Sequence, residues 1–177
     1  MSYDMYRSLP EGTGYDLLGG LCFREPMPTV SHQMVMRNIL ELLRRHARIG
    51  RSGVVLPEID VHLDGENAPA PDVCFVSRDR ARHLDNRGLH GIAPDLCVEV
   101  LSPSTAHRAR GEKAQLYGRF GCREYWLVDC EHLRVEVLRP GSDGTFAPFG
   151  AFGKAEAFGS LAVVGLHVDV AEVFAEY

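Results

Sequence analysis

The sequence has little lysine, no long apolar run and no closely spaced pair of cysteines. Its five cysteines are odd in number and form no C-x-x-C pair, which argues against a disulfide framework or a zinc knuckle and favours a reducing cytosol. No run reaches the roughly 18 apolar residues that cross a bilayer, and residues 1–10 lack the apolar centre of a secretory signal. These absences predict a cytoplasmic protein with no membrane partner.

The net charge and the common catalytic motifs exclude fewer classes of protein than these absences do. The net charge of -5 argues mildly against a surface coated in basic residues for nucleic acid, although a cleft can hold local charge of either sign. Only two of the 19 basic residues are lysines, and arginine suits bidentate contacts with phosphate. A codon bias in the source genome would produce the same surplus of arginine. The patterns H-E-x-x-H, G-x-S-x-G, G-x-G-x-x-G and the P-loop are all absent.

Apolar periodicity predicts an α/β domain. Ser31 suits the N-cap of a helix over 32–48, where apolar residues recur at helical spacing, and Gly50 suits its end. Further helices are expected over 104–120 and 170–177. Short apolar or alternating runs predict strands over 54–63, 73–76, 96–101, 125–128, 135–139 and 161–170. This order of elements favours a mixed β-sheet flanked by helices.

The most informative residue is Glu99, which sits inside the apolar run Leu-Cys-Val-Glu-Val-Leu over 96–101. A buried, ionised carboxylate without a partner is very unfavourable, so a core strand requires a cation, a metal or a water-filled cleft beside it. An edge strand, or a structural salt bridge to one of the many arginines, would also explain the residue.

A second acid, Asp72, opens the preceding apolar run. If the two strands are neighbours, Asp72 and Glu99 converge, and carboxylates that close repel unless a divalent cation lies between them. Hard oxygen ligands suit Mg²⁺, or else Mn²⁺. Taken alone, Asp72 would also fit a turn or a cap. Asp95 lies about 13 Å before Glu99 along a strand, too far to share its metal, so we assign it to the start of the strand, bonding backbone, and keep it as a second choice.

Lys113 is the third unusual residue. It lies on the apolar stripe of the second predicted helix, with Leu116 and Tyr117. A lysine on the stripe that packs onto the sheet requires a negative charge beneath it, and this helix directly follows the Glu99 strand. A lysine that lays its stem on the surface and keeps its ammonium in water would give the same pattern.

Six stretches of the sequence then suggest a family. They are 15–20 (YDLLGG), 31–33 (SHQ), 70–76 (APDVCFV), 94–104 (PDLCVEVLSPS), 111–113 (GEK) and 124–129 (EYWLVD). By these stretches, in this order, the chain resembles the bacterial Uma-type restriction endonuclease family of the PD-(D/E)XK nuclease superfamily. The resemblance covers nearly the whole chain, and its most specific part is 94–104 followed by Glu112-Lys113.

The resemblance implies a restriction-endonuclease-like fold and metal-dependent cleavage of phosphodiester bonds in DNA. It implies that Asp72 and Glu99, with the carbonyl of Val100, hold Mg²⁺, and that Lys113 orients the attacking water or neutralises charge in the transition state. Residues 31–177 would form the nuclease-like part of one compact domain, with 1–30 as a turn-rich lead-in. A homodimer is the usual arrangement for cutting both strands of a duplex.

Two features depart from the superfamily's pattern. Its lysine normally lies two residues after the acid on the same strand, where this chain has Leu101, so Lys113 would replace it from the adjacent helix. The family usually carries acids where this chain has Gly19 and Leu21, which weakens the case for a metal ligand in the N-terminal stretch.

Other side chains are candidates for the surroundings of the site or for substrate contacts. Arg108 and Arg110 flank it in sequence and could grip neighbouring phosphates, although both would also fit a solvated helix face. Tyr117 follows Lys113 by about one turn on the same stripe. His32 and Glu41 are nine positions apart on the first helix and point about 180° apart, so only one can face the site, and we favour His32. The other seven histidines show no metal-ligand spacing.

Two functions stay open at this point. The first is a Mg²⁺-dependent endonuclease that uses Asp72, Glu99 and Lys113. The alternative is a catalytically inactive nuclease-fold module that binds nucleic acid or a protein partner, which the acidic net charge and the displaced lysine favour. The sequence does not distinguish DNA from RNA, because no recognition helix or zinc module stands out.

Overall fold

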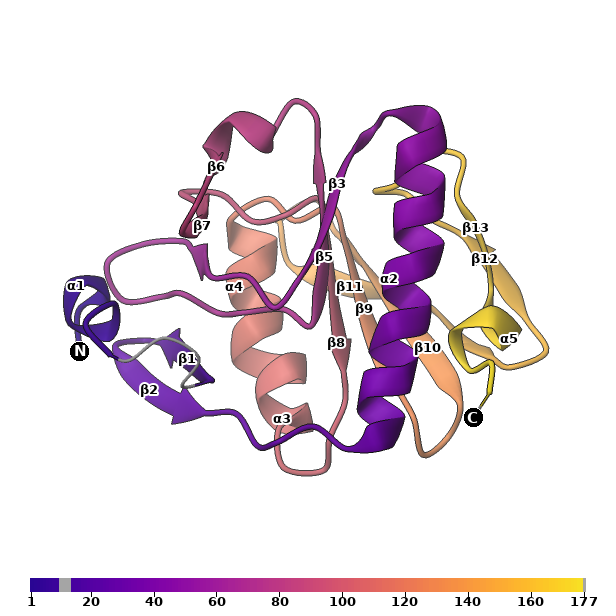
Figure 1. The fold of residues 1–177 in the computed structure, drawn as a ribbon, viewed down its shortest axis with the longest axis horizontal. Coiled ribbons are helices and arrows are strands. Elements are labelled where there is room, and N and C mark those ends of the chain that lie inside the picture. The colour runs from indigo at the N-terminus through magenta and orange to yellow at the C-terminus, as the bar shows by residue number, and fades with distance from the viewer. Residues whose placement is uncertain (10–13, 177) are drawn as a thin grey trace.

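The computed structural model describes residues 1–9 and 14–176. Its centre is a six-stranded sheet with the strand order β11-β10-β9-β8-β5-β3 (Figure 1). These strands are β3 (Gly53–Pro57), β5 (Val73–Ser77), β8 (Leu96–Val100), β9 (Glu124–Asp129), β10 (Arg134–Pro140) and β11 (Phe146–Gly153). Only β8 and β9 run parallel, and the other neighbours are antiparallel, so the sheet is mixed as predicted.

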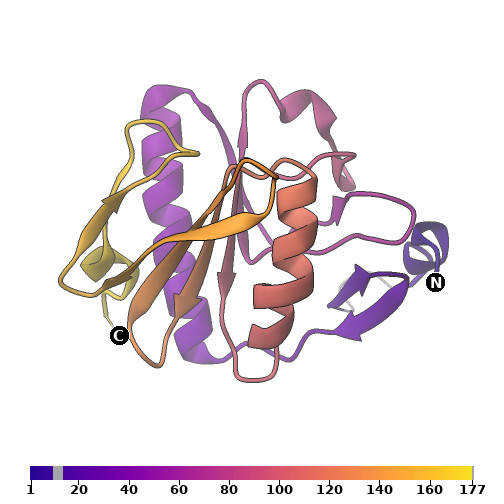
Figure 2. The ribbon, with the colours of Figure 1, turned by 180° about the vertical axis from the view of Figure 1, so that it is seen from behind.

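Helices cover both faces of this sheet. The long helix α2 (Val30–Gly50) lies on one face, and α4 (Ala114–Arg119) lies on the other, as Figures 1 and 2 show from opposite sides. Val35 and Ile39 of α2 belong to the first core, together with the buried side chains of Phe75 and Val98. The second core joins the other face of the sheet to α4 through residues such as Tyr117. The chain is therefore a three-layer α/β/α domain.

Strand β8 sends alternate side chains into the two cores. Val98 lies in the core under α2, whereas Cys97 lies in the core under α4. Because side chains alternate along a strand, Glu99 faces the same side as Cys97. The connection from β8 to the parallel strand β9 runs over this side through α3 (Ala106–Arg108), a π-helical turn η2 (Ala109–Lys113) and α4. The single helix expected over 104–120 is therefore three segments.

Smaller elements surround the sheet. They are α1 (Tyr3–Tyr6), the hairpin β1 (Tyr15–Leu18) and β2 (Leu21–Arg24), the strands β4 (Val61–His62), β6 (Leu84–Asp85) and β7 (Gly88–His90), the turn η1 (Ala81–His83), the pair β12 (Ala157–Gly159) and β13 (His167–Asp169), and α5 (Val170–Val173). The N-terminal lead-in is thus partly regular, and residues 10–13 of it, like residue 177 at the predicted last helix, lie outside the described residues.

The start of α2 differs from the prediction. Thr29, not Ser31, is the N-cap, because Thr29 has an extended backbone and its hydroxyl oxygen accepts a hydrogen bond from the backbone N–H of His32. The helix ends at Gly50, as predicted, and its C-cap is Arg51, whose φ of 46° places it in the left-handed region.

Two predicted strands are interrupted. The run 54–63 breaks after β3, where Glu58 adopts a φ of 45°, and β4 then joins β7 instead of the main sheet. The run 161–170 is a strand only over β13, which pairs with β12. In the first case the alternation of apolar residues reflects burial in two different cores, because Val55 lies in the core under α2 and Val61 in the core under α4. A period of two cannot distinguish this from one continuous strand.

Candidate active site

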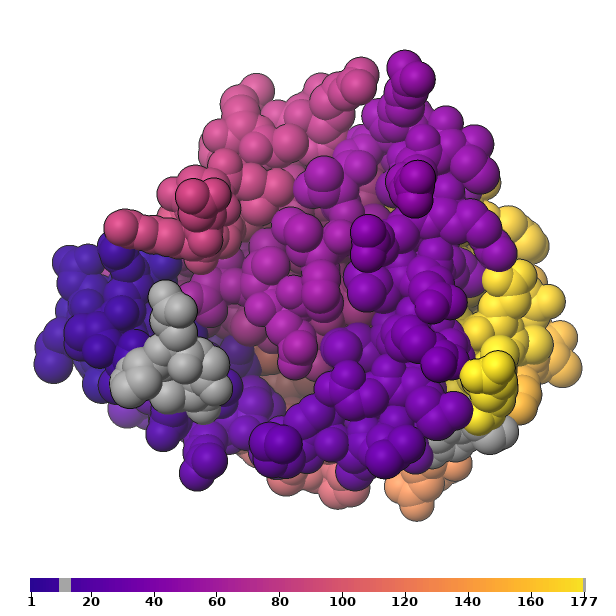
Figure 3. All heavy atoms as spheres, viewed as in Figure 1, coloured from indigo at the N-terminus to yellow at the C-terminus, as the bar shows by residue number. Residues whose placement is uncertain are grey.

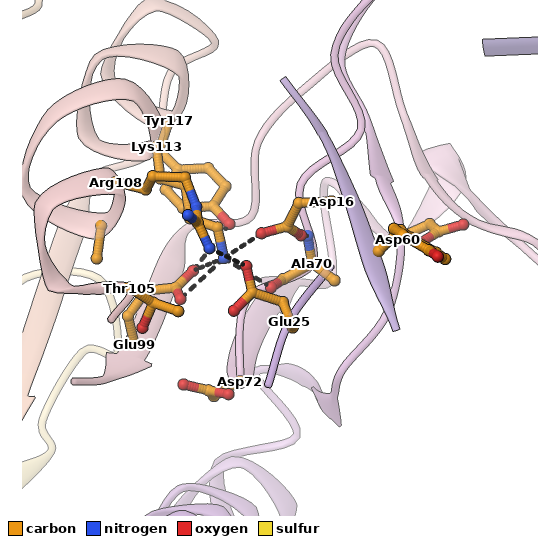
Figure 4. A network of polar contacts seen from close by, with 12 residues as sticks. Asp16, Glu25, Asp60, Ala70, Asp72, Glu99, Thr105, Arg108, Lys113 and Tyr117 are labelled. Carbon is orange, nitrogen blue, oxygen red and sulfur yellow. Dashed lines mark hydrogen bonds and ion pairs between the residues drawn. The ribbon is translucent and has the colours of Figure 1, made fainter. Parts of the chain in front are cut away.

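Lys113 is the centre of a buried polar cluster (Figure 4). Its side chain is 4% exposed, and its Nζ lies 2.8 Å from Asp16 Oδ2 and 3.0 Å from each carboxylate oxygen of Glu99. The ammonium also donates a hydrogen bond of 3.2 Å to the carbonyl oxygen of Ala70. Lys113 is therefore shielded from bulk water, and its ammonium is paired with the carboxylates of the cluster.

The path of the chain after β8 explains how a helical lysine reaches Glu99. A turn over 102–105 leads into α3, which brings the next turns of helix back over the side of the sheet that Glu99 faces. The π-helical turn η2 holds one residue more per turn than an α-helix, and Lys113 is its last residue. Lys113 thus reaches Glu99 from the helix. The usual position of this lysine, two residues after Glu99 on the strand, is occupied by Leu101.

Glu99 is held from two sides and titrates abnormally. The hydroxyl of Tyr117 donates a hydrogen bond of 3.2 Å to Glu99 Oε1, the oxygen that Lys113 also contacts. Burial raises the pKa of Glu99 to about 8, with Lys113 opposing the rise and the charges of Asp72 and Asp16 adding to it. Burial alone would lower the pKa of Lys113, but the carboxylates of Glu99 and Asp16 raise it above its usual value. The carboxylates therefore favour the charged form of Lys113, whereas burial disfavours the charged form of Glu99.

Asp72 lies beside the end of β8. It immediately precedes β5, which pairs antiparallel with β8, and its Oδ2 accepts a hydrogen bond of 2.6 Å from the backbone N–H of Val100. His32 Nε2 lies 3.4 Å from the same oxygen. Although burial opposes it, Asp72 raises the pKa of His32. The side chain of Asp72 is 19% exposed, against 9% for Glu99, so Asp72 lies at the more open side of the cluster.

A second pair of charges closes the cluster from the N-terminal hairpin. Arg108 Nη2 lies 3.1 Å from Glu25 Oε1, and its guanidinium lies over the ring of Phe23. Burial, and next the charge of Asp16, raise the pKa of Glu25. Four carboxylates thus gather around two permanent cations: Asp16, Glu25, Asp72 and Glu99 around Lys113 and Arg108. The cluster carries a surplus of negative charge when all four acids are ionised.

Two predicted candidates lie elsewhere. Asp95 is at the opposite end of β8, where its Oδ2 accepts a hydrogen bond of 2.8 Å from the backbone N–H of Ser77 and its Oδ1 lies 3.4 Å from Arg80 Nε. Arg110 makes two bonds, of 2.6 and 2.9 Å, to the carboxylate of Glu136. The structure therefore brings His32, Tyr117 and Arg108 to the cluster but neither Asp95 nor Arg110. Glu41, the residue weighed against His32, is exposed.

The sequence reasoning missed Asp16 and Glu25. Asp16 is fully buried on β1, and its Oδ1 accepts a hydrogen bond of 2.7 Å from the backbone N–H of Ala70, which ties the hairpin to the segment before Asp72. One signal was present: Asp16 is an acid followed by two leucines, the same kind of anomaly as Glu99. Glu25 has no such signal, because it follows the strand and has polar neighbours.

The donor chemistry of the cluster fits Mg²⁺. Among residues 1–9 and 14–176 no three His, Cys, Asp or Glu side chains are grouped so as to hold a metal ion. Mg²⁺, however, is usually held by one or two carboxylates and keeps several waters. Asp72 and Glu99 supply two hard oxygen donors, and the surface in Figure 3 is hollowed between the start of α2 and the segment around residue 70. Burial, and after it the negative charges of Asp72 and Asp16, raise the pKa of Glu99, and a bound cation would oppose that rise.

Comparison with known proteins places the chain in a family. The family model Uma2, described as "Putative restriction endonuclease", matches residues 3–171. The chain belongs to the Uma2 family. No curated protein matches the sequence. In the described part of this Uma2 protein, no helix has both the length and the apolar character needed to cross a membrane.

Solved structures support the fold. A "putative nuclease belonging to DUF820" from Anabaena variabilis ATCC 29413 superposes with a TM-score of 0.82 at 20% identity, over 98% of this chain and 97% of that one. At this identity the likeness shows the fold alone, and the predicted fold class is confirmed. The type IIG restriction endonuclease BpuSI gives a TM-score of 0.42 at 13% identity, over 71% of this chain and 14% of that one, which is too low to support an argument.

Proposed function

We propose that this Uma2 protein is a Mg²⁺-dependent endonuclease that hydrolyses phosphodiester bonds in DNA. The observation that supports the proposal best is the buried contact between Lys113 and Glu99, with Asp72 at the end of the neighbouring strand. An acid, a second acid and a lysine in this arrangement match what the family resemblance implies for these same residues. A purely structural ion pair would not need the additional carboxylates.

Each side chain would have a separate task. Asp72, Glu99 and the carbonyl of Val100 would hold the metal, which when bound polarises a phosphate oxygen and activates water. The ammonium of Lys113 would stabilise the negative charge that develops on the phosphate during attack. His32 would fix the orientation of Asp72 through their contact of 3.4 Å, and Tyr117 would fix that of Glu99 through its hydrogen bond.

Asp16 and Arg108 would act through other residues. Asp16 contacts Lys113 at 2.8 Å and so positions its ammonium, and it does not need to bind the metal itself. Arg108 is 3.1 Å from Glu25, so it would have to leave this carboxylate before it could bind a phosphate of the substrate. Arg110 would have to leave Glu136 in the same way.

The test is cleavage of plasmid and of single-stranded DNA and RNA with Mg²⁺, with Mn²⁺ or with EDTA. We expect cleavage that requires metal and that falls at least a hundredfold in Asp72→Asn and Glu99→Gln, both of which keep the shape of the side chain. Lys154→Ala, at the only other lysine, and Asp79→Asn should cleave normally, because both residues are exposed. Equal cleavage in Glu99→Gln and the unchanged protein would refute the site.

A second candidate function is a nuclease-fold module without activity. One observation favours it: Lys113 contacts both oxygens of Glu99, the acid that would hold the metal. In that case calorimetry should detect no Mg²⁺ or Mn²⁺ binding, while binding of nucleic acid or a protein would persist in Asp72→Asn. Metal binding that is lost in Glu99→Gln would exclude this alternative.

Three further properties belong to the same proposal. Residues 1–30 and 31–177 would form one compact nuclease domain, because Asp16 of the first segment contacts Lys113 of the second. The protein would act in the cytoplasm, and it would form a homodimer when it cuts a duplex. Sedimentation equilibrium with and without a short duplex tests the dimer, and a monomer under both conditions would contradict it.

A further inference from the structure

A pair of histidines lies on the small sheet formed by β4, β7 and β6. The parallel pairing of β4 with β7 puts His62 directly beside His90, and their Nδ1 atoms are 3.3 Å apart. The two residues are 28 positions apart in the sequence, so a short motif could not have predicted that they pair. This sheet lies towards α1 in Figure 1, and neither histidine contacts the carboxylates of the candidate active site.

The surroundings fix which nitrogens face one another. His90 Nε2 lies 2.9 Å from Asp85 Oδ1, an oxygen that also accepts a hydrogen bond of 2.7 Å from the backbone N–H of Arg87. The ionised carboxylate therefore keeps a proton on Nε2 of His90, and the lone pair of a neutral ring is left on Nδ1, facing His62. The Tyr3 ring stacks on His62 with centroids 3.5 Å apart and an angle of 7°, which holds that ring in place.

The separation of the two nitrogens suits a bound metal ion. Two nitrogens that each lie about 2.0–2.1 Å from one tetrahedral ion are about 3.3–3.4 Å apart, which the observed 3.3 Å matches. Without an ion, the same separation allows a direct hydrogen bond between the two rings, with the donor set by the tautomer.

We propose that His62 Nδ1 and His90 Nδ1 bind one divalent transition-metal ion of the zinc class, with water in the remaining coordination positions. Imidazole nitrogen favours zinc, cobalt, nickel or copper over magnesium, so this site and the oxygen-lined active site would take different ions. Asp85 would be the carboxylate that orients the histidine ligand, as carboxylates commonly do around zinc. The ion would join β4, β7 and, through Tyr3, the N-terminal helix α1.

The experiment is a titration of chelator-treated, full-length protein with Co²⁺, followed by its visible absorption, and with Zn²⁺, followed by calorimetry. Excess Mg²⁺ is present throughout to fill the oxygen-lined site. We expect one ion per chain, no detectable binding in His62→Gln or His90→Gln, and a Kd raised about tenfold to a hundredfold in Asp85→Asn. Thermal melting confirms that each variant is folded.

The matched control is His132→Gln. His132 Nδ1 also contacts a carboxylate, Asp129, at 2.9 Å, but no second imidazole faces its ring among the described residues. This variant should bind Co²⁺ and Zn²⁺ as the unchanged protein does. Absence of binding in the unchanged protein would overturn the proposal. It would also be overturned if His62→Gln and His90→Gln bound the ion with the same Kd as the unchanged protein, because the ion would then be held by thiols or carboxylates elsewhere.

Discussion

Replacing Lys113 with methionine should destabilise the protein strongly, because the substitution removes the cation from a cluster of buried acids. The ammonium lies within 3.0 Å of carboxylate oxygens of both Asp16 and Glu99, whose residues are 0% and 7% exposed. Removing one partner of a buried ion pair typically costs about 3–5 kcal/mol, since the other partner is left unpaired. Methionine keeps most of the apolar stem, so the loss is mainly electrostatic.

The effect should depend on pH in a defined direction. The carboxylates raise the pKa of Lys113 in the folded state, so the lysine's contribution to stability is fully present at neutral pH and is lost as pH rises through the folded value. In the variant, Glu99 lacks its cation and can take up a proton instead, because its pKa is already raised to about 8. The destabilisation should therefore be larger at pH 9 than at pH 6, where protonation of Glu99 limits the cost.

Urea unfolding followed by the fluorescence of the buried Trp126 measures these changes. The double variant Lys113→Met with Glu99→Gln should lose less than the sum of the two single losses, by about 0.5–3 kcal/mol, because Glu99 then has no charge to be left unpaired and only Asp16 loses its cation. Lys154→Met should change stability by no more than about 0.5 kcal/mol. A loss below about 1 kcal/mol for Lys113→Met, or additivity in the double variant, would refute the reasoning.

Three more predictions test other parts of the structure. Mg²⁺ affinity measured by calorimetry should rise about tenfold from pH 7 to pH 9, because the ion must displace the proton of Glu99, whose pKa is about 8, and a flat profile would contradict this origin. Glu124→Ala should lower the unfolding free energy by about 3 kcal/mol or more in chemical denaturation, since it removes the acceptor for Ser160 and leaves Arg139 without its partner. Thr29→Ala should lower the free energy of unfolding by about 1 kcal/mol, because the N-cap of α2 is lost, whereas Ser31→Ala should leave it almost unchanged. The reverse order in thermal melts would identify Ser31 as the N-cap.

The residues of the site that could be predicted from the sequence stand out from the apolar pattern of their near neighbours in the chain. Glu99 and Asp72 were recognisable because each interrupts or opens an apolar run, and burial of such a run follows from its composition. Lys113 was recognisable because helical periodicity places it on a buried stripe. In each case the anomaly and its neighbours lie within about one turn or one strand, so the local pattern contains the necessary information.

The part that was not predictable depends on how distant segments dock. Asp16 reaches Lys113 only because the N-terminal hairpin packs against residue 70, through its bond to the Ala70 backbone. The π-helical turn before Lys113 has no clear sequence mark and changes the direction of every later side chain on that helix. Arg110, which lies within this turn, contacts Glu136 and not the cluster, although it is only three residues from Lys113 in sequence.

The number of acids in the cluster bears on whether it is a structural or a functional feature. A structural ion pair needs one acid for each base, because every further buried carboxylate adds desolvation and repulsion without adding a partner. Here Asp72 adds to the negative charge around Glu99 although neither Lys113 nor Arg108 contacts it. Its partners are His32, at 3.4 Å, and the backbone N–H of Val100, so the cluster holds more acids than its two permanent cations can pair. Asp72→Asn should therefore leave stability unchanged or raise it in the absence of metal, while it weakens Mg²⁺ binding. A variant that loses stability without metal and still binds Mg²⁺ normally would identify Asp72 as a cap for the backbone of Val100 and nothing more.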